Sequence, residues 1–329
     1  MKVYNDKIED IGQVMISFLN DYRHKRGFDA KTYIENKKEV INAYFKESKL
    51  THAVVAVSGG IDSAIVLGLL KETLSMEGSS LKEIVAITLP AKTNSGVTGQ
   101  ITSEERAIEV CNALGVKAHS VDLSIHSKHI SHDIESVLSI EANDWAKGQL
   151  VPYLRTSMLY YFTTLLTQEN KKAVLVGTTN ADEGQYLGYI GKASDGMVDI
   201  QPISDLHKSE VYLVAKELNI PESIINIKPT GDMYDNRTDE EVFGASYNFV
   251  EAYYAYLKCG DTKKEELMMS LHDANEMPLF ERLSGNLEKM HAYNKHKYLG
   301  CSPAVHLDIY DMKIKGGWKY FVWEACNEK

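Results

Sequence analysis

The sequence predicts an α/β protein with a doubly wound, mostly parallel sheet, helices on both faces, and helical additions at both ends. Strand-sized apolar runs alternate with segments of helical periodicity. The runs AVVAV at 53–57 and AVLVG at 173–177 are typical of strands buried on both faces. Since no Pro- or Ser-rich linker interrupts the chain, we expect a single domain: a helical flank at 1–50, a core at 51–250, and a helical segment and tail at 251–329.

The first fifty residues predict two helices. Apolar side chains recur every three or four positions in two groups, separated by Gly27: Ile11, Val14, Met15, Phe18 and Leu19, then Tyr33, Val40, Ile41 and Tyr44. A flank of this kind usually packs on its own core or contacts another subunit.

The core continues the alternation of strands and helices. The expected elements are a strand at 84–89, a helix at 103–115, a strand at 116–123, a helix at 152–168 and, after the strand at 173–177, a helix at 208–219 that ends before Pro221. Ser103 can cap the second of these and Gly115 can end it. Beyond about residue 240 the chain is helical and rich in Tyr, and the tail after Asp308 is polar.

Composition excludes several functional classes. Lys and Arg total 36 against 46 Asp and Glu, a net charge of −10, which disfavours binding to nucleic acid or an anionic membrane. Neither a signal peptide nor a run long enough to span a bilayer is present in the sequence. The four cysteines, Cys111, Cys259, Cys301 and Cys326, form no CxxC pair. We therefore expect a cytoplasmic protein with free thiols.

The segment between the first strand and its helix has the features of a phosphate-binding loop. Gly59 and Gly60 let backbone N–H groups approach an anion at a helix N-terminus, and the hydroxyls of Ser58 and Ser63 add donors. Asp62 would repel a phosphate unless a divalent cation lay between them, so the residue types imply Mg²⁺.

The loop differs from two common nucleotide-binding motifs. It lacks the lysine of GxxxxGK[ST], which disfavours a kinase or GTPase, and it is not GxGxxG, which disfavours a Rossmann dehydrogenase. The alternative without a binding role is an ordinary strand–turn–helix connection in which Ser and Asp only cap the helix.

The SGGIDS loop resembles the pyrophosphate loop of the N-type ATP pyrophosphatases, which cleave ATP between its α and β phosphates to adenylate a substrate. GMP synthetases, asparagine synthetases, tRNA thiolases and NAD synthetases share it. Further segments, in the family's order, resemble the ammonia-dependent NAD synthetases: GTTNADE at 177–183, VDIQPI at 198–203 with DLHK at 205–208, PTGDM at 229–233 with TDEEVFGASY at 238–247, and His296-Lys297.

This resemblance implies roles for residues on the ATP side. Asp62 and Glu183 would be magnesium ligands, and Lys208 would neutralise phosphate charge as pyrophosphate leaves. Thr178 and Thr230 would touch ATP together with the loop residues Ser58, Gly59, Gly60 and Ser63. Glu183 and Lys208 could otherwise be ordinary solvated residues.

The resemblance also implies a substrate side, where the sequence departs from the family pattern. Lys192, Asp199, His296, Lys297 and Arg155 match positions that hold the pyridine nucleotide, and a partner subunit supplies some of them in relatives. Tyr153 stands where the family has a further arginine, and residues 191–197 differ from its usual TKYGDGG. His296-Lys297 is followed by YLGCSP, not by the usual HKR-x-x-P.

The implied reaction amidates a nicotinate nucleotide. The carboxylate of nicotinate adenine dinucleotide attacks the α-phosphorus of Mg·ATP, and ammonia then displaces AMP to give NAD. The fifty residues before the loop are too few for a fused glutaminase, so we expect ammonia as nitrogen donor, and the family resemblance implies a homodimer. The alternatives are an NMN synthetase-like enzyme that amidates nicotinate mononucleotide, adenylation of another carboxylate, and a non-catalytic nucleotide sensor. Because Asp62, Glu183 and Lys208 are all present, a sensor is disfavoured.

Overall fold

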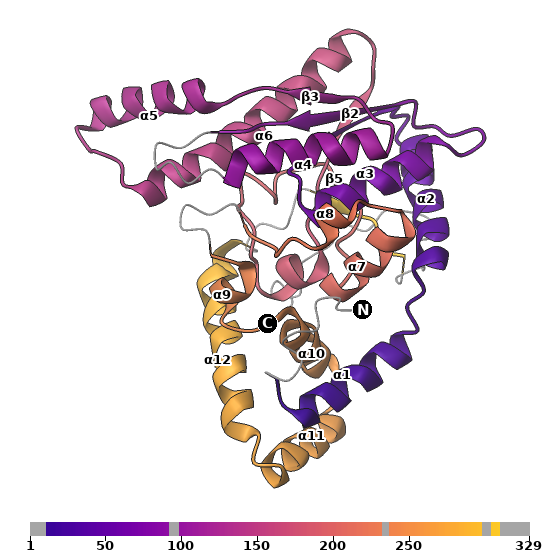
Figure 1. The fold of residues 1–329 in the computed structure, drawn as a ribbon, viewed down its shortest axis with the longest axis vertical. Helices are drawn as coiled ribbons and strands as arrows, with labels where there is room; N and C mark the ends of the chain where they lie inside the picture. Colours follow the sequence, from indigo (N-terminus) through magenta and orange to yellow (C-terminus); the bar gives the residue numbers. More distant parts are fainter. Residues whose placement is uncertain (1–10, 92–98, 232–236, 298–303, 310–329) are drawn as a thin grey trace.

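A computed structural model describes residues 11–91, 99–231, 237–297 and 304–309. Its sheet has six strands in the order β3-β2-β1-β4-β5-β6, and every adjacent pair is parallel (Figure 1). The strands are β1 His52–Ala56, β2 Glu83–Thr88, β3 Ala118–Ser120, β4 Ala173–Val176, β5 Ile200–Gln201 and β6 Val305–His306. The predicted parallel α/β sheet is confirmed.

Helices make up most of the remaining described chain. They are α1 Gln13–Arg26, α2 Ala30–Glu47, α3 Ile61–Leu74, α4 Gly99–Ala113, α5 Ser124–Leu138, α6 Asp144–Gln168, α7 Lys208–Glu217, α8 Glu222–Ile225, α9 Asp239–Phe243, α10 Tyr247–Lys258, α11 Asp261–Asp273 and α12 Met277–Asn294. A π-helical turn, η2, covers Asp182–Tyr186, and a 3₁₀ turn, η3, covers Lys295–Lys297.

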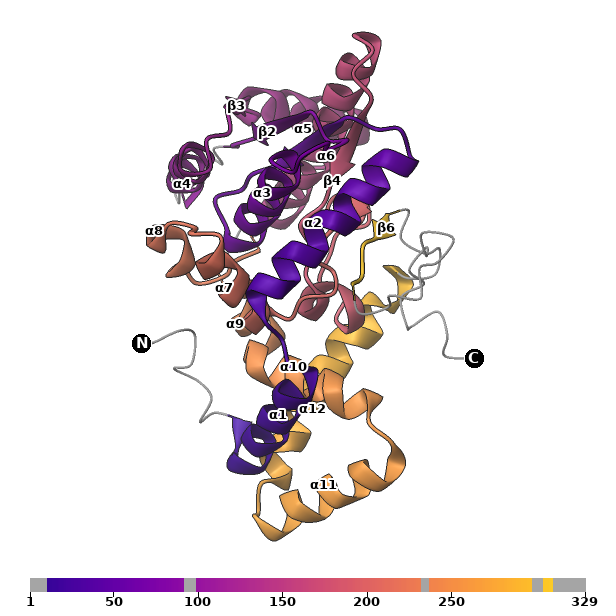
Figure 2. The same ribbon diagram turned by 90° about the vertical axis from the view of Figure 1, so that its right-hand side faces the viewer.

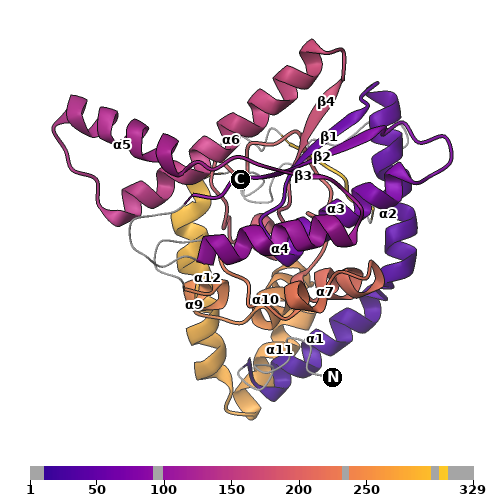
Figure 3. The same cartoon turned by 45° about the horizontal axis from the view of Figure 1, so that its top comes forward.

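Alternate residues of the central strands face two different cores. Val55 of β1 packs with apolar side chains of α2, α3, α4 and α7, whereas Val54 packs with α6 on the other face. Figure 3 shows α6 on the side of the sheet away from α3 and α4, with α5 alongside it at the edge of the molecule. Both faces are therefore covered by helices, as expected of a doubly wound sheet.

A third core lies outside the sheet and consists only of helices and turns. Buried side chains of α1, α10, α11 and α12 meet there, among them Met15, Phe249, Leu271 and Leu287. Figure 2 shows this helical region below the sheet, with α2 running from the sheet toward it. Gly27, between α1 and α2, has a φ of +56°, so the predicted break falls where the chain passes between the two regions.

Several element boundaries differ from the sequence prediction. Ser103 does not cap a helix, because α4 begins at Gly99 and Ser103 lies inside it. The helix expected at 152–168 begins at Asp144, where the Asn143 side chain accepts a hydrogen bond from Ala146 N, and it continues through Pro152. The sequence prediction also missed α5. It missed β5 and β6 because a strand of two residues is too short to show a periodic pattern. Within the described ranges, no helix is both long and apolar enough to span a bilayer.

Candidate active site

The SGGIDS loop joins the end of β1 to the start of α3. Gly59 has a φ of +80°, and a Cβ there would fall 2.3 Å from the carbonyl oxygen of Ser103 in α4, so only glycine fits. The Ser63 hydroxyl donates to Gly60 O at 3.0 Å and accepts from Ser58 N at 3.2 Å. Gly60 N donates to the Ser58 hydroxyl at 3.3 Å. The loop is thus held in shape by its own two serines.

A second loop leaves the neighbouring strand β4 at the same edge of the sheet. The Gln201 side chain packs against Gly177 and accepts a hydrogen bond from Thr179 N at 3.1 Å. Thr178, between these two loop residues, is half-buried. The Asn180 amide donates to Asp62 Oδ1 at 2.9 Å and so joins this loop to α3. Because successive crossovers leave β1 and β4 over opposite faces, this is the topological switch point at which open α/β sheets bind ligands.

Lys208 brings the two predicted magnesium ligands together. Its Nζ donates to Asp62 Oδ2 at 2.6 Å and to Glu183 Oε1 at 3.0 Å. Only 2% of the Lys208 side chain is exposed. Burial alone would lower the lysine pKa, but the surrounding carboxylates outweigh burial and raise the pKa well above its usual 10.5. Lys208 is therefore a permanently charged ammonium group inside the fold.

The pKa of Glu183 is raised by its surroundings. Burial raises its pKa from 4.5 to about 7, with Lys208 opposing the shift and Asp62 and Asp239 adding to it. It lies on η2, and π-helical turns are frequent at functional sites. Burial also raises the pKa of Asp239. Three carboxylates thus share one ammonium group.

Tyr247 completes this group. Its hydroxyl lies 2.8 Å from Asp239 Oδ2 and 2.9 Å from Glu183 Oε1, so its single proton can be donated to either carboxylate. Burial, followed by the negative charge of Glu183, raises the Tyr247 pKa well above 10, which keeps the hydroxyl protonated. The Lys208 ammonium lies 5.0 Å from the centre of the Tyr247 ring.

The first turns of four helices supply side chains to this cluster. Asp62 is in the first turn of α3, and Lys208, Asp239 and Tyr247 are the first residues of α7, α9 and α10. Helix N-termini present unpaired N–H groups and partial positive charge. An arrangement of this kind, with Gly59 and Gly60 at one of the termini, suits a polyanion such as a nucleotide phosphate chain.

The predicted substrate-side residues form a looser group. Lys297 on η3 donates to Gly188 O at 3.0 Å. Burial lowers the pKa of Lys297, Asp195 raises it and the positive charge of Lys192 lowers it further, so these three side chains are electrostatic neighbours. Lys192 and His296 are exposed. The structure therefore brings Lys192 and Lys297 into one region, beside the loop that follows Glu183.

Three other predicted residues make contacts that do not join them to Lys208. Asp199 accepts from Leu175 N at 2.7 Å on β4, and Arg155 donates to Leu89 O at 3.0 Å beyond β2. Thr230 is exposed, next to Gly231, where a Cβ would meet the Tyr189 hydroxyl. Their roles stay predictions.

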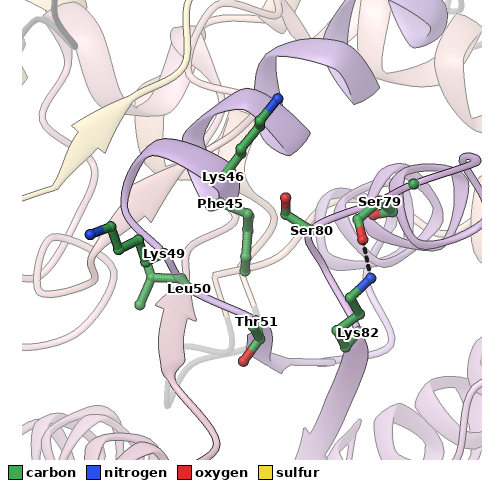
Figure 4. A pocket seen from close by; sticks show the side chains of 9 residues that line it. Phe45, Lys46, Lys49, Leu50, Thr51, Ser79, Ser80 and Lys82 are labelled. Atoms are coloured by element: carbon green, nitrogen blue, oxygen red, sulfur yellow. Dashed lines mark hydrogen bonds between the residues drawn. The ribbon is translucent and has the colours of Figure 1, made fainter.

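A hollow of about 330 Å³ lies at the opposite edge of the sheet (Figure 4). It is lined by Phe45, Lys46, Lys49, Leu50, Thr51, Gly78, Ser79, Ser80 and Lys82. These residues precede β1 and β2, whereas the charged cluster follows β1 and β4. The hollow is therefore separate from the candidate active site.

The family model for NAD synthase matches residues 33–298. The chain belongs to the NAD synthase family. It is 29% identical over 273 residues to the NH(3)-dependent NAD(+) synthetase of Thermoplasma volcanium, covering 82% of this chain and 95% of that protein. It is 30% identical over 238 residues to the enzyme of the same name from Methanococcoides burtonii, covering 72% and 84%.

Two solved structures share the fold of this chain. The structure of NMN synthetase from Francisella tularensis aligns with a TM-score of 0.65 at 22% identity, covering 82% of this chain and 96% of that one. The NH3-dependent NAD synthetase of Campylobacter jejuni aligns with a TM-score of 0.56 at 24% identity, covering 81% and 96%. At these identities the likeness supports the architecture alone.

Sequence reasoning missed several residues of the cluster. Asn180, Asp239 and Tyr247 lie inside segments used to recognise the family, yet they were given no role. The signal available was position: Asn180 lies in the loop that follows β4, and Asp239 and Tyr247 each begin a helix. Their convergence on Lys208 depends on contacts between residues distant in sequence, which a local pattern does not reveal.

Proposed function

We propose that this chain is a cytoplasmic ligase that uses ATP and ammonia to convert nicotinate adenine dinucleotide to NAD, releasing AMP and pyrophosphate. The observation that carries the proposal is the Asp62–Lys208–Glu183 cluster at the carboxyl ends of β1 and β4. It occurs in a chain of the NAD synthase family, whose curated relatives are named NH(3)-dependent NAD(+) synthetases.

In this proposal the phosphates of ATP lie over the SGGIDS loop. Gly59 and Gly60 lie directly before α3, at whose start an anion is favoured, and Ser58 and Ser63 add hydroxyls in the same loop. Thr178 and Thr230 contact the nucleotide from the neighbouring loops. Lys208 lies beside the loop and stabilises the charge that develops on pyrophosphate as it leaves.

The donor types at the cluster suit Mg²⁺. Asp62 and Glu183 supply two carboxylates that contact the same Lys208 ammonium, at 2.6 and 3.0 Å. Mg²⁺ in nucleotide sites commonly uses one or two carboxylates together with substrate phosphates and water. When bound, the ion would neutralise phosphate charge and hold the triphosphate for in-line attack.

The chemistry then needs positioning more than a general base. The nicotinate carboxylate attacks the α-phosphorus of ATP, the α–β phosphoanhydride bond breaks and pyrophosphate leaves. Ammonia attacks the resulting acyl adenylate, the acyl–oxygen bond breaks, and AMP departs as the amide loses a proton. Lys208 is already charged and needs no proton transfer to act, which suits a group whose role is electrostatic.

The substrate side is proposed to hold the nicotinate nucleotide. Lys192 and Lys297 supply two positive charges near one loop, suited to the phosphates of a dinucleotide, and His296, Asp199 and Arg155 complete the predicted set. The proposal includes a homodimer. Supporting it, α5 and α6 expose large apolar side chains, including Val137 (84% exposed), Leu138 (60%), Trp145 (54%) and Tyr161 (58%).

The test is release of pyrophosphate and AMP with Mg·ATP and ammonium, comparing nicotinate adenine dinucleotide with nicotinate mononucleotide. We expect turnover with the dinucleotide, none when magnesium is chelated, and little when glutamine replaces ammonium. A preference for the mononucleotide would replace the proposed substrate with the smaller one. No release of pyrophosphate or AMP with either nucleotide would overturn the proposal.

A further inference from the structure

Two consecutive residues of η2 pair with two consecutive residues at the start of α7. Glu183 contacts the Lys208 ammonium, and Asp182, one residue earlier, contacts His207. Asp182 Oδ1 lies 2.7 Å from His207 Nδ1, and its Oδ2 accepts from Lys208 N at 2.7 Å. One carboxylate therefore holds both the ring beside Lys208 and the backbone from which Lys208 projects.

This inner pair is fully enclosed. The side chains of Asp182 and His207 are 1% and 2% exposed. A buried, hydrogen-bonded polar pair fixes geometry tightly, because moving either partner leaves the other buried without its hydrogen-bond partner.

Helix α1 contacts the pair from behind. The hydroxyl of Tyr22 lies 3.0 Å from His207 Nε2. Arg26 forms a two-point ion pair with Glu210, with Nη2 to Oε2 at 2.9 Å, and the same carboxylate oxygen accepts from His207 N at 2.9 Å. Helix α1 ends at Arg26, before residue 33, where the match to the family model begins.

Helix α2 holds the chain just before α7. Asp205 accepts from the Tyr33 hydroxyl and from Lys37 Nζ, both at 2.8 Å, and Arg26 donates to its backbone oxygen at 2.7 Å. Residues 205–210 are thus held by both N-terminal helices as well as by η2.

We propose that Asp182 and His207 are positioning residues that fix Lys208 against Asp62 and Glu183, and that the N-terminal helices act as the brace behind them. The inference rests on the proposed function, since Lys208 has its role only there. The described contacts of the Asp182 carboxylate are with His207 and with the backbone of Lys208, so its effect on turnover passes through Lys208. The N-terminal flank then contributes to catalysis by holding the segment that carries Lys208, in addition to packing on the core.

The main test is Asp182→Asn, which keeps size and one acceptor but removes the charge. We expect kcat to fall about 10- to 100-fold, the usual effect of removing a group that orients a functional side chain, with the KM for the nicotinate nucleotide nearly unchanged. A merely structural role would lower the melting temperature without this split between kcat and KM. A kcat within about threefold of wild type would overturn the proposal.

A double-mutant cycle tests whether the effect passes through Lys208. Once Lys208→Met has removed the ammonium group, adding Asp182→Asn should lower kcat by less than about threefold further, because the lysine is no longer there to be positioned. If the two losses multiply, Asp182 acts on something else and the proposal fails.

Two His207 variants keep the proposal testable if Asp182→Asn does not fold. His207→Asn places an amide donor near the position of Nδ1 and should retain most of the wild-type kcat, whereas His207→Leu should lose it about as Asp182→Asn does. Equal kcat in the two variants would contradict the assignment. The matched control is Glu83→Gln, which disrupts the His52–Glu83 pair at the opposite edge of the sheet and should leave kcat unchanged.

Failure of this inference is distinguishable from failure of the proposed function. If the wild-type protein releases no AMP with either nicotinate nucleotide, the proposed function fails before any variant is compared. If wild type turns over and the Asp182 and His207 variants match it, only the positioning role is wrong.

Discussion

The two sides of the candidate active site are built differently. On the adenylating side, Lys208 is almost fully buried and contacts two carboxylates directly. On the acceptor side, Lys192 and His296 are exposed, and Lys297 has one described hydrogen bond, to a backbone oxygen. The common chemistry is thus part of the interior of the protein, while the groups proposed to recognise the acceptor are exposed (Lys192 and His296) or half-buried (Lys297, Asp199 and Arg155).

This difference follows from the cost of burying charge. An ammonium group inside the fold is tolerated only when carboxylates surround it, so removing Lys208 is expected to disturb folding as well as the proposed chemistry. An exposed lysine can be replaced with little effect on the fold. The departures from the family pattern at Tyr153 and at 191–197 fall at positions that the family resemblance assigns to the acceptor side. Tyr153 is 44% exposed.

The largest effect is expected from Lys208→Met, which keeps the bulk of the side chain and removes its charge. Loss of a buried electrostatic group that acts on a leaving phosphate should lower kcat about 100- to 1,000-fold. The carboxylates of Asp62 and Glu183 would also lose their shared partner, so the melting temperature of the metal-free protein should change as well. Pyrophosphate release under saturating Mg·ATP measures the first effect and thermal unfolding the second.

The control for this variant is Lys216→Met, in the last turn of the same helix and far from its N-terminal residue. It should retain wild-type kcat. If Lys208→Met retained a kcat within about tenfold of wild type, the proposed catalytic role of the buried Lys208 ammonium would be wrong.

Much of the adenylating side was predictable because its signals are local. A buried strand followed by SGGIDS and a helix fixes a phosphate loop within one short segment, and the alternation of apolar runs predicts the parallel sheet. Asp62 follows from the loop itself, whereas Glu183 and Lys208 are implied by the family resemblance of their short motifs, and the structure brings all three together.

The supporting residues were not predictable in the same way. Asp182 sits one position from Glu183, yet its role depends on His207, 25 residues later, and on Tyr22 far earlier in the chain. Asn180 and Tyr247 likewise act across long separations. Hydrophobic periodicity identifies which residues face a core, but it does not say which polar side chains meet there.

The pH dependence of stability should sharpen the comparison, because a buried carboxylate titrates differently from an exposed one. Glu183 has a pKa of about 7 in the folded protein against 4.5 ordinarily. Between those values the unfolded chain has released the proton that the folded protein still binds, so metal-free stability should fall as pH rises from about 4.5 to 7. Glu183→Gln, which stays neutral, should lack this component.

The measurement is thermal unfolding of wild type and Glu183→Gln at pH 5 and pH 8, with and without magnesium and an ATP analogue. In the metal-free state, we expect the melting temperature of the variant, relative to that of wild type, to be higher at pH 8 than at pH 5 by roughly a few degrees. Added Mg·nucleotide should narrow or reverse that difference, because it binds the ionised carboxylate of the folded protein. An identical pH dependence in the two proteins would show that Glu183 is ionised throughout.

The smallest effect is expected on the acceptor side, from Lys297→Met. Removing one positive charge beside Lys192 and Asp195 should raise the KM for nicotinate adenine dinucleotide about tenfold, while the KM for ATP stays near that of wild type. An equal rise in both KM values would place Lys297 on the adenylating side, and no change in either would remove it from the site. The expected split separates the two regions: a surface charge that acts on one substrate differs from a buried charge on which the reaction as a whole depends.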